Sequence, residues 1–447
     1  MVTKATSDVV DLASPTLTGV PTAPTASPGT NSVQIATTAY ADAIAALKAN
    51  LASPALTGTP TVPTASLGTN TTQAASTAFV VANAGGGIVT PDKLSPFVGP
   101  YRNALMNGNF EIWQRGTSFA TLGASALVYT ADRWAYMTNG AARATVTQDA
   151  SVPTFAQAGV VLPYSLKVAC TTTNAAPATG NYSLLAQNIE GYLWRKFWQR
   201  PLVISFWVKA SQTGTFGVTI ESGASDRSYI GQYTVSVANT WEFKTVAFLA
   251  SPSSGTWPLA TTPGAGLYFS LCAGATYIST AGSWLSTNAF SVSGNVNVMS
   301  STSNVWQIAG LQLEVGTAAS EFEDVPFDVN LQRCKRYFQK SFDYNVAPAP
   351  WPSAGSSGAQ SWACGVGAST ASVYPVMLPV VMRAAPVLVL WNPSAANAQM
   401  RNGTLGTDFT LSAAANSSER NFWITATSPA SSVAGNSVSV HWTADAE

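Results

Sequence analysis

The sequence predicts a mainly β protein in three parts: an extended N-terminal stalk with short coiled-coil helices, a jelly-roll β-sandwich and a small C-terminal β domain. Three observations predict this organisation. Two copies of a proline-rich repeat come first, short alternating strand patterns fill the middle, and turn residues separate short apolar runs in the last part. The expected boundaries are residues 1–13 before the repeats, 14–87 for the repeats, 88–101 for a linker, 102–328 for the sandwich and 329–447 for the C-terminal domain.

The N-terminal part is a tandem repeat. The segment Ser14–Ser27 returns as Ser53–Ser66, an offset of 39 residues (53 − 14) that also relates Gln34–Tyr40 to Gln73–Phe79. A period of this size indicates an array. Prolines in the first half of each copy favour an extended backbone, because proline fixes φ and cannot donate a hydrogen bond.

The second half of each copy predicts a short helix. Thr37 and Thr38 are suitable N-terminal caps, and the apolar residues that follow at coiled-coil spacing are Tyr40, Ile44, Leu47 and Leu51. The repeat has too few large apolar side chains to offset the entropy of ordering it. We therefore expect copies of the chain to associate as a parallel homo-oligomeric stalk; the alternative is a disordered Thr/Pro/Ala linker.

The repeat unit also carries a family resemblance. Its pattern is Ser-Pro-x-Leu-Thr-Gly-x-Pro-Thr-x-Pro-Thr-Ala-Ser, then Gly-Thr-Asn, then Gln-x-Ala-[Thr/Ser]-Thr-Ala-[Tyr/Phe], from Ser14 to about Asn83. This pattern resembles the repeat of bacteriophage tail fibres. The resemblance implies an elongated homotrimeric fibre with a receptor-binding tip, in which residues 1–13 attach to a tail or baseplate protein of the virion.

Composition restricts the possible partners. Charged residues make up 9% of the chain and the formal net charge is zero, so we expect no binding to nucleic acid. Met1–Leu12 lacks the apolar core of a signal peptide, and the apolar stretch Val376–Trp391 is interrupted by Pro379, Arg383 and Pro386, so we expect no membrane insertion. These features predict assembly in the host cytoplasm and a final location in the virion tail fibre.

The region from Asn107 to Glu323 predicts the β-sandwich. Leu202–Val208 is an almost continuous apolar run that suits a central strand. The other strand patterns are Phe216–Ile220, Trp241–Thr245, Leu267–Leu271 and Trp306–Val315. Many short strands without long helices favour a jelly roll. The tryptophans within these patterns, Trp134, Trp207 and Trp306, are expected to lie in its core.

Five segments in this region carry a second resemblance. They are Asn107–Ser118, Ala131–Trp134, Gln187–Gly191, Ser205–Ala210 and Gln312–Gly316. In this order they resemble a carbohydrate-binding-module-like domain that is common in phage fibres. The resemblance implies a structural Ca²⁺, for which Glu111 is the one metal ligand that can be named. Ala309 and Gly310 stand where further acidic ligands are expected.

The last part begins with a hinge. Asp324–Phe342 predicts a short helix in which Leu331, Cys334 and Phe338 share a face. From Tyr344 onward, strands such as Val387–Leu390 and Phe422–Ile424 alternate with turns, which predicts a small β domain at the distal tip. The cysteines make no CxxC pair, so we expect buried or half-buried free thiols: Cys170, Cys272, Cys334 and Cys364.

Residues for catalysis are scarce. His441 is the only histidine and no GxSxG motif is present, so a Ser-His-Asp triad is not expected. Paired carboxylates could cleave glycans, and the acids that lie close in sequence are Glu321, Glu323 and Asp324, and Glu221 and Asp226. We expect these acids to be solvated, and the protein not to be an enzyme.

Tryptophan is abundant, with 14 residues, and indole rings bind the C–H faces of sugars. We predict receptor or glycan contacts for the C-terminal tryptophans Trp351, Trp362, Trp391, Trp423 and Trp442. Trp194 and Trp198 are further candidates, because they belong to an aromatic-basic cluster with Tyr192, Arg195, Lys196, Phe197 and Arg200. That cluster could contact acidic glycans or a neighbouring protomer.

The predicted function is that of a phage tail fibre protein that trimerises and binds a host-surface polysaccharide or lipopolysaccharide during adsorption. Two alternatives stay open: a tailspike-type polysaccharide depolymerase and a purely structural tail or baseplate adaptor.

Overall fold

The computed structural model describes residues 19–46, 62–63, 101–123, 126–353, 355–365, 369, 371–415 and 417–447. It forms two compact units, Met1–Val89 and Thr90–Glu447, and each is described by itself. The predictions for residues 1–13, for nearly all of the second repeat copy, for Leu47 and Leu51 and for the linker up to residue 100 lie outside the described residues.

The first unit contains the predicted repeat helix. Helix α1 (Thr38–Ala46) begins where the sequence places it, and Thr37 Oγ1 accepts a hydrogen bond from the Tyr40 amide at 3.2 Å. The Tyr40 hydroxyl donates to the Thr30 carbonyl at 2.9 Å, which ties the helix to the proline-rich half of the repeat. No residue of α1 is buried. The large apolar side chains of this copy that are exposed are Val20, Val33 and Ile35.

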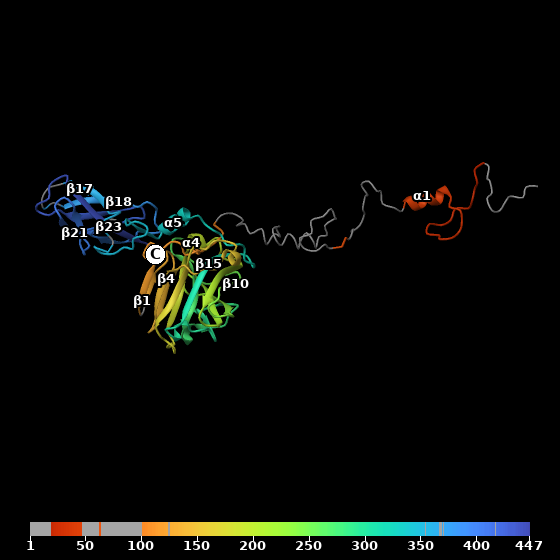
Figure 1. Cartoon of the computed structure of the whole chain (residues 1–447), viewed down its shortest axis with the longest axis horizontal. Helices are drawn as coiled ribbons and strands as arrows, with labels where there is room; N and C mark the ends of the chain where they lie inside the picture. Colours follow the sequence, from red (N-terminus) through yellow and green to blue (C-terminus); the bar gives the residue numbers. More distant parts are fainter. Residues whose placement is uncertain are drawn as a thin grey trace, which may run out of the picture. The chain divides into compact units, whose positions relative to one another are not determined.

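The second unit contains a β-sandwich (Figure 1), which confirms the mainly β prediction. One of its sheets contains, in spatial order, β1 (Ser118–Leu122), β4 (Arg143–Asp149), β5 (Ser165–Thr172), β15 (Val305–Val315), β7 (Leu202–Ala210) and β10 (Glu242–Phe248). The facing sheet contains β13 (Trp284–Leu285), β9 (Ser228–Val235), β8 (Gly214–Ser222), β11 (Pro263–Ala273), β6 (Tyr182–Glu190), β3 (Ala135–Asn139) and β2 (Ala126–Tyr129). We call them the first and the second sheet.

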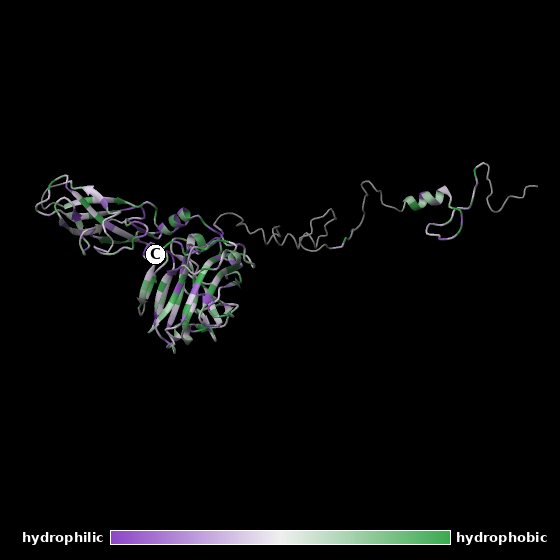
Figure 2. Cartoon of the chain, viewed as in Figure 1, coloured by the Kyte–Doolittle hydropathy of each residue, from purple (hydrophilic) through white to green (hydrophobic). Residues whose placement is uncertain are grey.

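Period-two alternation explains why these segments form strands. Apolar and polar residues alternate along the strands (Figure 2), so each strand turns one face toward the partner sheet. In β7 the inward residues Ile204, Phe206 and Val208 are fully buried. Trp134 and Trp306 are also fully buried, as predicted. Short elements connect the strands: α3 (Phe155–Ala158), α4 (Gly191–Trp194), η1 (Ala275–Tyr277), η2 (Val298–Ser300) and the parallel pair β12 (Ile278–Ser279) and β14 (Ser291–Val292).

The C-terminal part forms a third sheet with its own core. Its strands are β16 (Phe338–Lys340), β23 (Ser437–Asp445), β20 (Met400–Asn402), β21 (Thr407–Ala415), β22 (Asn421–Thr427) and β18 (Ala371–Met377), while β17 (Gln360–Ala363) and β19 (Val387–Trp391) pair with β23. The predicted hinge helix is α5 (Phe327–Lys335), and the predicted boundary at 328/329 falls inside it. Phe338 lies in β16 rather than on the helix.

Two further sequence predictions can be compared with the structure. Cys170, Cys272, Cys334 and Cys364 are all buried, as expected. In the part of the chain that the structure describes, no helix combines the length and apolarity needed to cross a bilayer.

Candidate functional site

The outer face of the first sheet carries an aromatic platform. Ser205, Trp207 and Lys209 alternate along β7 with the core residues, so their side chains lie on the opposite face, where Ser205 is buried and the other two are half-buried. On the edge strand β10, Phe243 is the direct cross-strand partner of Trp207. The two ring centroids lie 5.3 Å apart with the planes tilted by 52°. Phe243 is 48% exposed, so part of this aromatic surface faces water.

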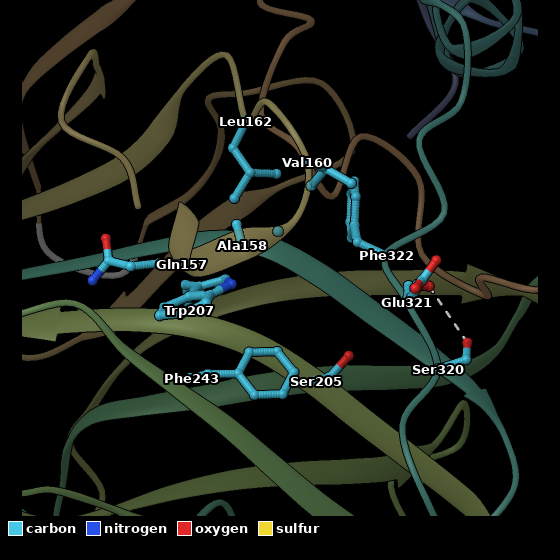
Figure 3. Close-up of a pocket in the computed structure, with 11 residues that line it drawn as sticks. Gln157, Ala158, Val160, Leu162, Ser205, Trp207, Phe243, Ser320, Glu321 and Phe322 are labelled. Atoms are coloured by element: carbon cyan, nitrogen blue, oxygen red, sulfur yellow. Dashed lines mark hydrogen bonds between the residues drawn. The ribbon is translucent and has the colours of Figure 1, made fainter. Parts of the chain in front are cut away.

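A pocket of about 240 Å³ opens on this platform. Trp207, Phe243 and Ser205 form its floor, and the wall consists of α3 with the segment after it and the segment that follows β15 (Figure 3). The wall residues are Gln157, Ala158, Val160, Leu162, Ser320, Glu321 and Phe322. Apolar rings below and polar side chains at the rim give the pocket two different surfaces.

A β-bulge shapes the pocket floor. The register between β15 and β7 shifts between Ala309 and Gln312, and Gly310 at this shift has φ +59°. A Cβ at Gly310 would lie 3.1 Å from a methyl group of Leu162 in the wall. The position therefore requires glycine both for its backbone conformation and for the close approach of the wall.

Hydrogen bonds hold the polar rim in place. The Ser320 hydroxyl donates to Glu314 Oε2 at 2.7 Å, and the Ser320 amide donates to Glu314 Oε1 at 2.7 Å. On the opposite wall, Gln157 Oε1 accepts from the Thr154 amide at 2.9 Å in a capping box that fixes α3. The rim is thus preorganised, which reduces the entropy cost of binding a ligand.

The platform continues beyond the pocket. Lys209 lies two residues after Trp207 on the same face, and its Nζ lies 5.0 Å from the centre of the Trp241 ring. The same Nζ donates to Ser151 Oγ at 2.7 Å. Burial lowers the pKa of Lys209. A strip of aromatic surface with interspersed hydrogen-bonding groups therefore runs along β7 and β10.

The prediction that Trp207 lies in the core was wrong, because its side chain is only half-buried. Its neighbours at i−2 and i+2 are Ser205 and Lys209, which are polar, while Phe206 and Val208 belong to the buried set. Strict period-two counting therefore places Trp207 on the polar face. The continuous apolar appearance of Leu202–Val208 concealed this alternation.

The predicted receptor tryptophans of the C-terminal domain have different environments. Trp351 and Trp423 are 40% and 44% exposed. Trp362 packs against Tyr374, and Trp391 lies 6.2 Å from the ring of Phe342. None of the five lines the pocket on the first sheet.

Like Trp362, three further candidate tryptophans pack in or against a core. Trp442 is 4% exposed, and its Nε1 donates to Gln360 Oε1 at 3.0 Å. Trp194 is fully buried and stacks on Trp257 at 5.7 Å. Trp198 is partly buried against the same core. Neither Trp442 nor Trp194 presents a ring to solvent, so the glycan-contact prediction for these two does not fit the structure.

The predicted metal ligand Glu111 lies elsewhere on the sandwich. Asn109 Nδ2 donates to its carboxylate at 3.3 Å. Burial raises the pKa of Glu111, and the nearby charge of Asp324 adds to that effect. Within the described residues, no group of three or more His, Cys, Asp or Glu side chains is arranged to hold a metal ion. Calcium binding at Glu111 stays a prediction without further support.

The candidate catalytic acids are engaged in different contacts. Glu323 accepts from the backbone amides of Arg102 and Asn103 at 3.3 and 2.8 Å. Asp226 accepts from the Ser222 hydroxyl at 2.8 Å, and Glu221 is buried. Among the described residues that line the sheet-face pocket, Glu321 is the only one with a carboxylate. The pocket lining therefore lacks the second carboxylate that glycoside hydrolysis uses.

His441 has a structural environment. Its ring stacks on Phe342 with centroids 3.9 Å apart, and its Nδ1 lies 3.0 Å from Ser341 Oγ. That hydroxyl oxygen also accepts from the Trp442 amide at 2.9 Å. Because Ser341 is bonded to the backbone of β23, this Ser–His contact supports the sheet rather than forming an exposed nucleophile.

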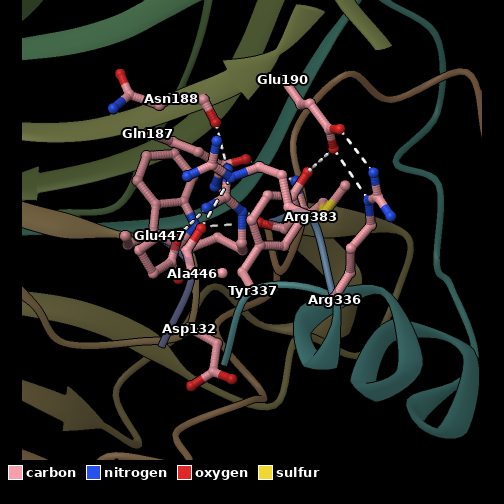
Figure 4. A network of polar contacts seen from close by, with 12 residues as sticks. Asp132, Gln187, Asn188, Glu190, Arg336, Tyr337, Arg383, Ala446 and Glu447 are labelled. Carbon is pink, nitrogen blue, oxygen red and sulfur yellow. Dashed lines mark hydrogen bonds and ion pairs between the residues drawn. The ribbon is translucent and has the colours of Figure 1, made fainter. Parts of the chain in front are cut away.

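A buried polar cluster joins the sandwich to the C-terminal sheet (Figure 4). The Glu447 carboxylate pairs with Arg133, and its other oxygen lies 3.6 Å from Arg115. Arg336 donates to both oxygens of Glu190, at 2.7 and 3.1 Å. The Tyr337 hydroxyl donates to the same carboxylate at 2.7 Å. These charges are paired with one another, so the cluster serves as a structural connection.

The comparisons with known proteins give only a distant likeness. No family model and no curated protein matches the sequence. Similar solved structures include a candidate sugar-binding protein from Bacteroides thetaiotaomicron, with 14% identity over 48% of this chain and 99% of that chain at a TM-score of 0.28. They also include the family 11 carbohydrate-binding module from Clostridium thermocellum, with 12% identity over 46% and 99% at 0.24. A third is TmCBM61 in complex with β-1,4-galactotriose, with 11% identity over 48% and 99% at 0.25. A likeness of this size carries no conclusion about the ligand of this chain.

Proposed function

We propose that this protein binds a glycan on the outer face of the first sheet, with Trp207 and Phe243 stacking on a sugar ring. The observation that carries this proposal is the cross-strand pair of half-buried Trp207 and exposed Phe243 beneath a pocket with a polar rim. Aromatic rings complement the apolar C–H faces of sugars, and fixed polar groups such as Gln157 and Ser320 supply hydrogen bonds to hydroxyls.

We expect Trp207→Ala to weaken binding of the best glycan from an array of bacterial surface polysaccharides at least tenfold, because truncation of a central aromatic residue typically costs about 2 kcal/mol or more. Phe243→Ala should weaken it in the same direction. Titration calorimetry on the full chain measures both. Trp423→Ala is the matched control, because it removes an exposed indole from the C-terminal sheet.

The Trp423→Ala control also distinguishes a binding site on the first sheet from one on the C-terminal domain. If Trp423→Ala abolishes binding while Trp207→Ala leaves it unchanged, the receptor site lies on the C-terminal domain and the proposal fails. Release of reducing ends from the bound polysaccharide would instead favour the depolymerase alternative, and an array without any hit would favour a structural adaptor.

In its wider role, we propose a trimeric phage tail fibre of the virion that assembles in the host cytoplasm, attaches through residues 1–13 to a tail or baseplate protein and adsorbs to host polysaccharide or lipopolysaccharide. Support comes from the repeat sequence and from α1, which buries none of its residues in a single chain. Weak sites on three protomers would act together, and avidity can exceed a single-site affinity by about 10²–10⁴.

Association can be tested by sedimentation. The wild-type protein should sediment as a trimer at micromolar concentration, and Ile44→Asp should shift it toward smaller species, because a charge in the predicted seam opposes packing between helices. Asp42→Asn, which changes a charge at an exposed position of the same helix, is the control. A folded wild-type monomer would remove the oligomeric part of the proposal and leave the glycan site intact.

A further inference from the structure

A second and larger groove lies at the junction of the sandwich and the C-terminal domain. Its volume is about 880 Å³, and it shares no lining residue with the sheet-face pocket. The residues that give it chemical character are Tyr101, Tyr192, Lys196, Arg333, Arg336 and Val381. Tyr192 is exposed, and the Arg195 guanidinium lies 5.3 Å from the centre of its ring.

One face of helix α5, together with its C-cap residue Arg336, supplies three of the groove's polar side chains. The lining residues Val329, Gln332, Arg333 and Arg336 follow one another at helical spacing, so they share a side of the helix. The opposite side, with Asn330 and Cys334, is buried in the protein. The helix is therefore held on one side by packing and presents an amide and two guanidinium groups on the other.

The charges of the groove do not balance. The lining contains Lys196, Arg333 and Arg336 against the single acid Glu190. Glu190 is already neutralised, because Arg336 binds both of its oxygens. In the part of the chain that the structure describes, no hydrogen bond or ion pair reaches the side chain of Lys196 or Arg333.

Arg333 is the more constrained of these two cations. Its guanidinium lies 5.4 Å from the centre of the Tyr101 ring. Burial lowers its pKa, and the nearby Glu323 opposes that effect. The Glu323 carboxylate, however, accepts hydrogen bonds from the backbone amides of residues 101–103. A half-buried guanidinium without an ion-pair partner that lines an open groove is suited to an external anion.

We propose that this groove binds an anionic sugar unit, whose carboxylate or phosphate contacts Arg333 and Lys196 while the sugar ring lies against Tyr192 and Tyr101. A guanidinium group presents parallel N–H donors that match the oxygens of either anion. The aromatic rings provide the apolar contact that a sugar ring requires. This site does not depend on the sheet-face pocket, and it would make the protein selective for acidic glycans.

The experiment compares three probes of the same ring: glucuronic acid, glucose 6-phosphate and glucose, each titrated into the full chain at low ionic strength and followed by NMR. We expect binding of one or both anionic probes at millimolar concentration or tighter, and no binding of glucose in this groove. Glucuronic acid and glucose 6-phosphate distinguish a carboxylate from a phosphate ligand. Raising the salt concentration should weaken the interaction, since the contacts are partly exposed.

Variants assign the binding to the groove. Arg333→Gln and Lys196→Gln should each weaken the anionic probe about tenfold, which is typical of the loss of a hydrogen bond to a charged group. Lys335→Gln is the matched control, because it removes the same charge from α5 at a position that does not line the groove. Trp207→Ala should leave the anionic probe unaffected, so failure of the sheet-face proposal can be told apart from failure of this one.

Several results would overturn the inference. They are no binding of either anion to the wild type, equal binding by wild type and Arg333→Gln, or the same loss in Lys335→Gln. A change in sedimentation of Arg333→Gln or Lys196→Gln without a change in anion binding would also overturn it, because the groove would then be a contact between copies of the chain.

Discussion

Replacing Glu447 by Gln should lower the free energy of unfolding by about 3–5 kcal/mol, because it leaves two buried guanidinium groups without part of their counter-charge. The Glu447 side chain is 3% exposed and pairs with Arg133 and Arg115. Arg115 also binds Asp445 at 2.9 Å, and Arg383 Nε donates to the Ala446 carbonyl at 2.8 Å. Because Arg383 also donates to the Thr261 carbonyl of the sandwich at 2.9 Å, the end of β23 is fixed to the sandwich by charge and by hydrogen bonds together.

A double-mutant cycle measures the interaction between Glu447 and Arg133. Arg133→Met removes the cation that lies 3.5 Å from the centre of the Tyr337 ring. The double variant should lose less stability than the sum of the losses in the two single variants. Urea unfolding followed by tryptophan fluorescence measures all three. Lys167→Gln is the control, because its partner Asp149 is partly exposed and such pairs contribute about 0–1 kcal/mol. If Glu447→Gln unfolds like the control, the pair does not hold the junction.

Replacing Glu221 by Gln should stabilise the protein at pH 8 and leave its stability at pH 4 nearly unchanged. Burial raises the pKa of Glu221 from 4.5 to about 7, while hydrogen bonds from Ser225 and Tyr268 only partly oppose this. Between these two values the folded state binds a proton that the unfolded state does not, so stability falls as pH rises and the full cost is present above pH 7. A pKa shift of this size lowers the free energy of unfolding above pH 7 by up to about 3 kcal/mol.

The measurement is thermal unfolding of wild type and Glu221→Gln across the range from pH 4 to pH 8. Glu242→Gln is the control of opposite sign. Burial opposes ionisation of Glu242, but hydrogen bonds from Lys244, Val237 and Ser236 hold its pKa below the usual value. Its loss should therefore destabilise the protein at pH 8. If the unfolding temperatures of wild type and Glu221→Gln change with pH in the same way, ionisation of Glu221 does not destabilise the folded state.

Local patterns made the strands predictable. The apolar run at Leu202, the alternation at Phe216 and the helix at Asp324 correspond to β7, β8 and α5. Period-two spacing reports on a single strand, so it works wherever one face is buried. The same spacing identifies Trp207 as an outward residue once Ser205 and Lys209 are counted with it.

The environment of the other tryptophans could not be predicted in this way. Trp194 is buried because Trp257, 63 residues later (257 − 194), packs on its ring. Trp442 is covered because Phe422 on β22 packs edge-on against its ring, with the centroids 5.5 Å apart. The Arg133–Glu447 pair joins positions 314 residues apart. Such contacts depend on the tertiary fold, and a short sequence window contains no trace of them.

The position of β23 has a consequence for biosynthesis. This strand, Ser437–Asp445, pairs with β16, β17, β19 and β20, which cover residues 338–402. During translation those strands leave the ribosome before β23 and cannot pair with it until it has been made, since non-local pairing requires both partners. The strands of the sandwich all precede β23 in the chain, so the sandwich can close before the C-terminal sheet, whose apolar strands stay incompletely paired until β23 has been made.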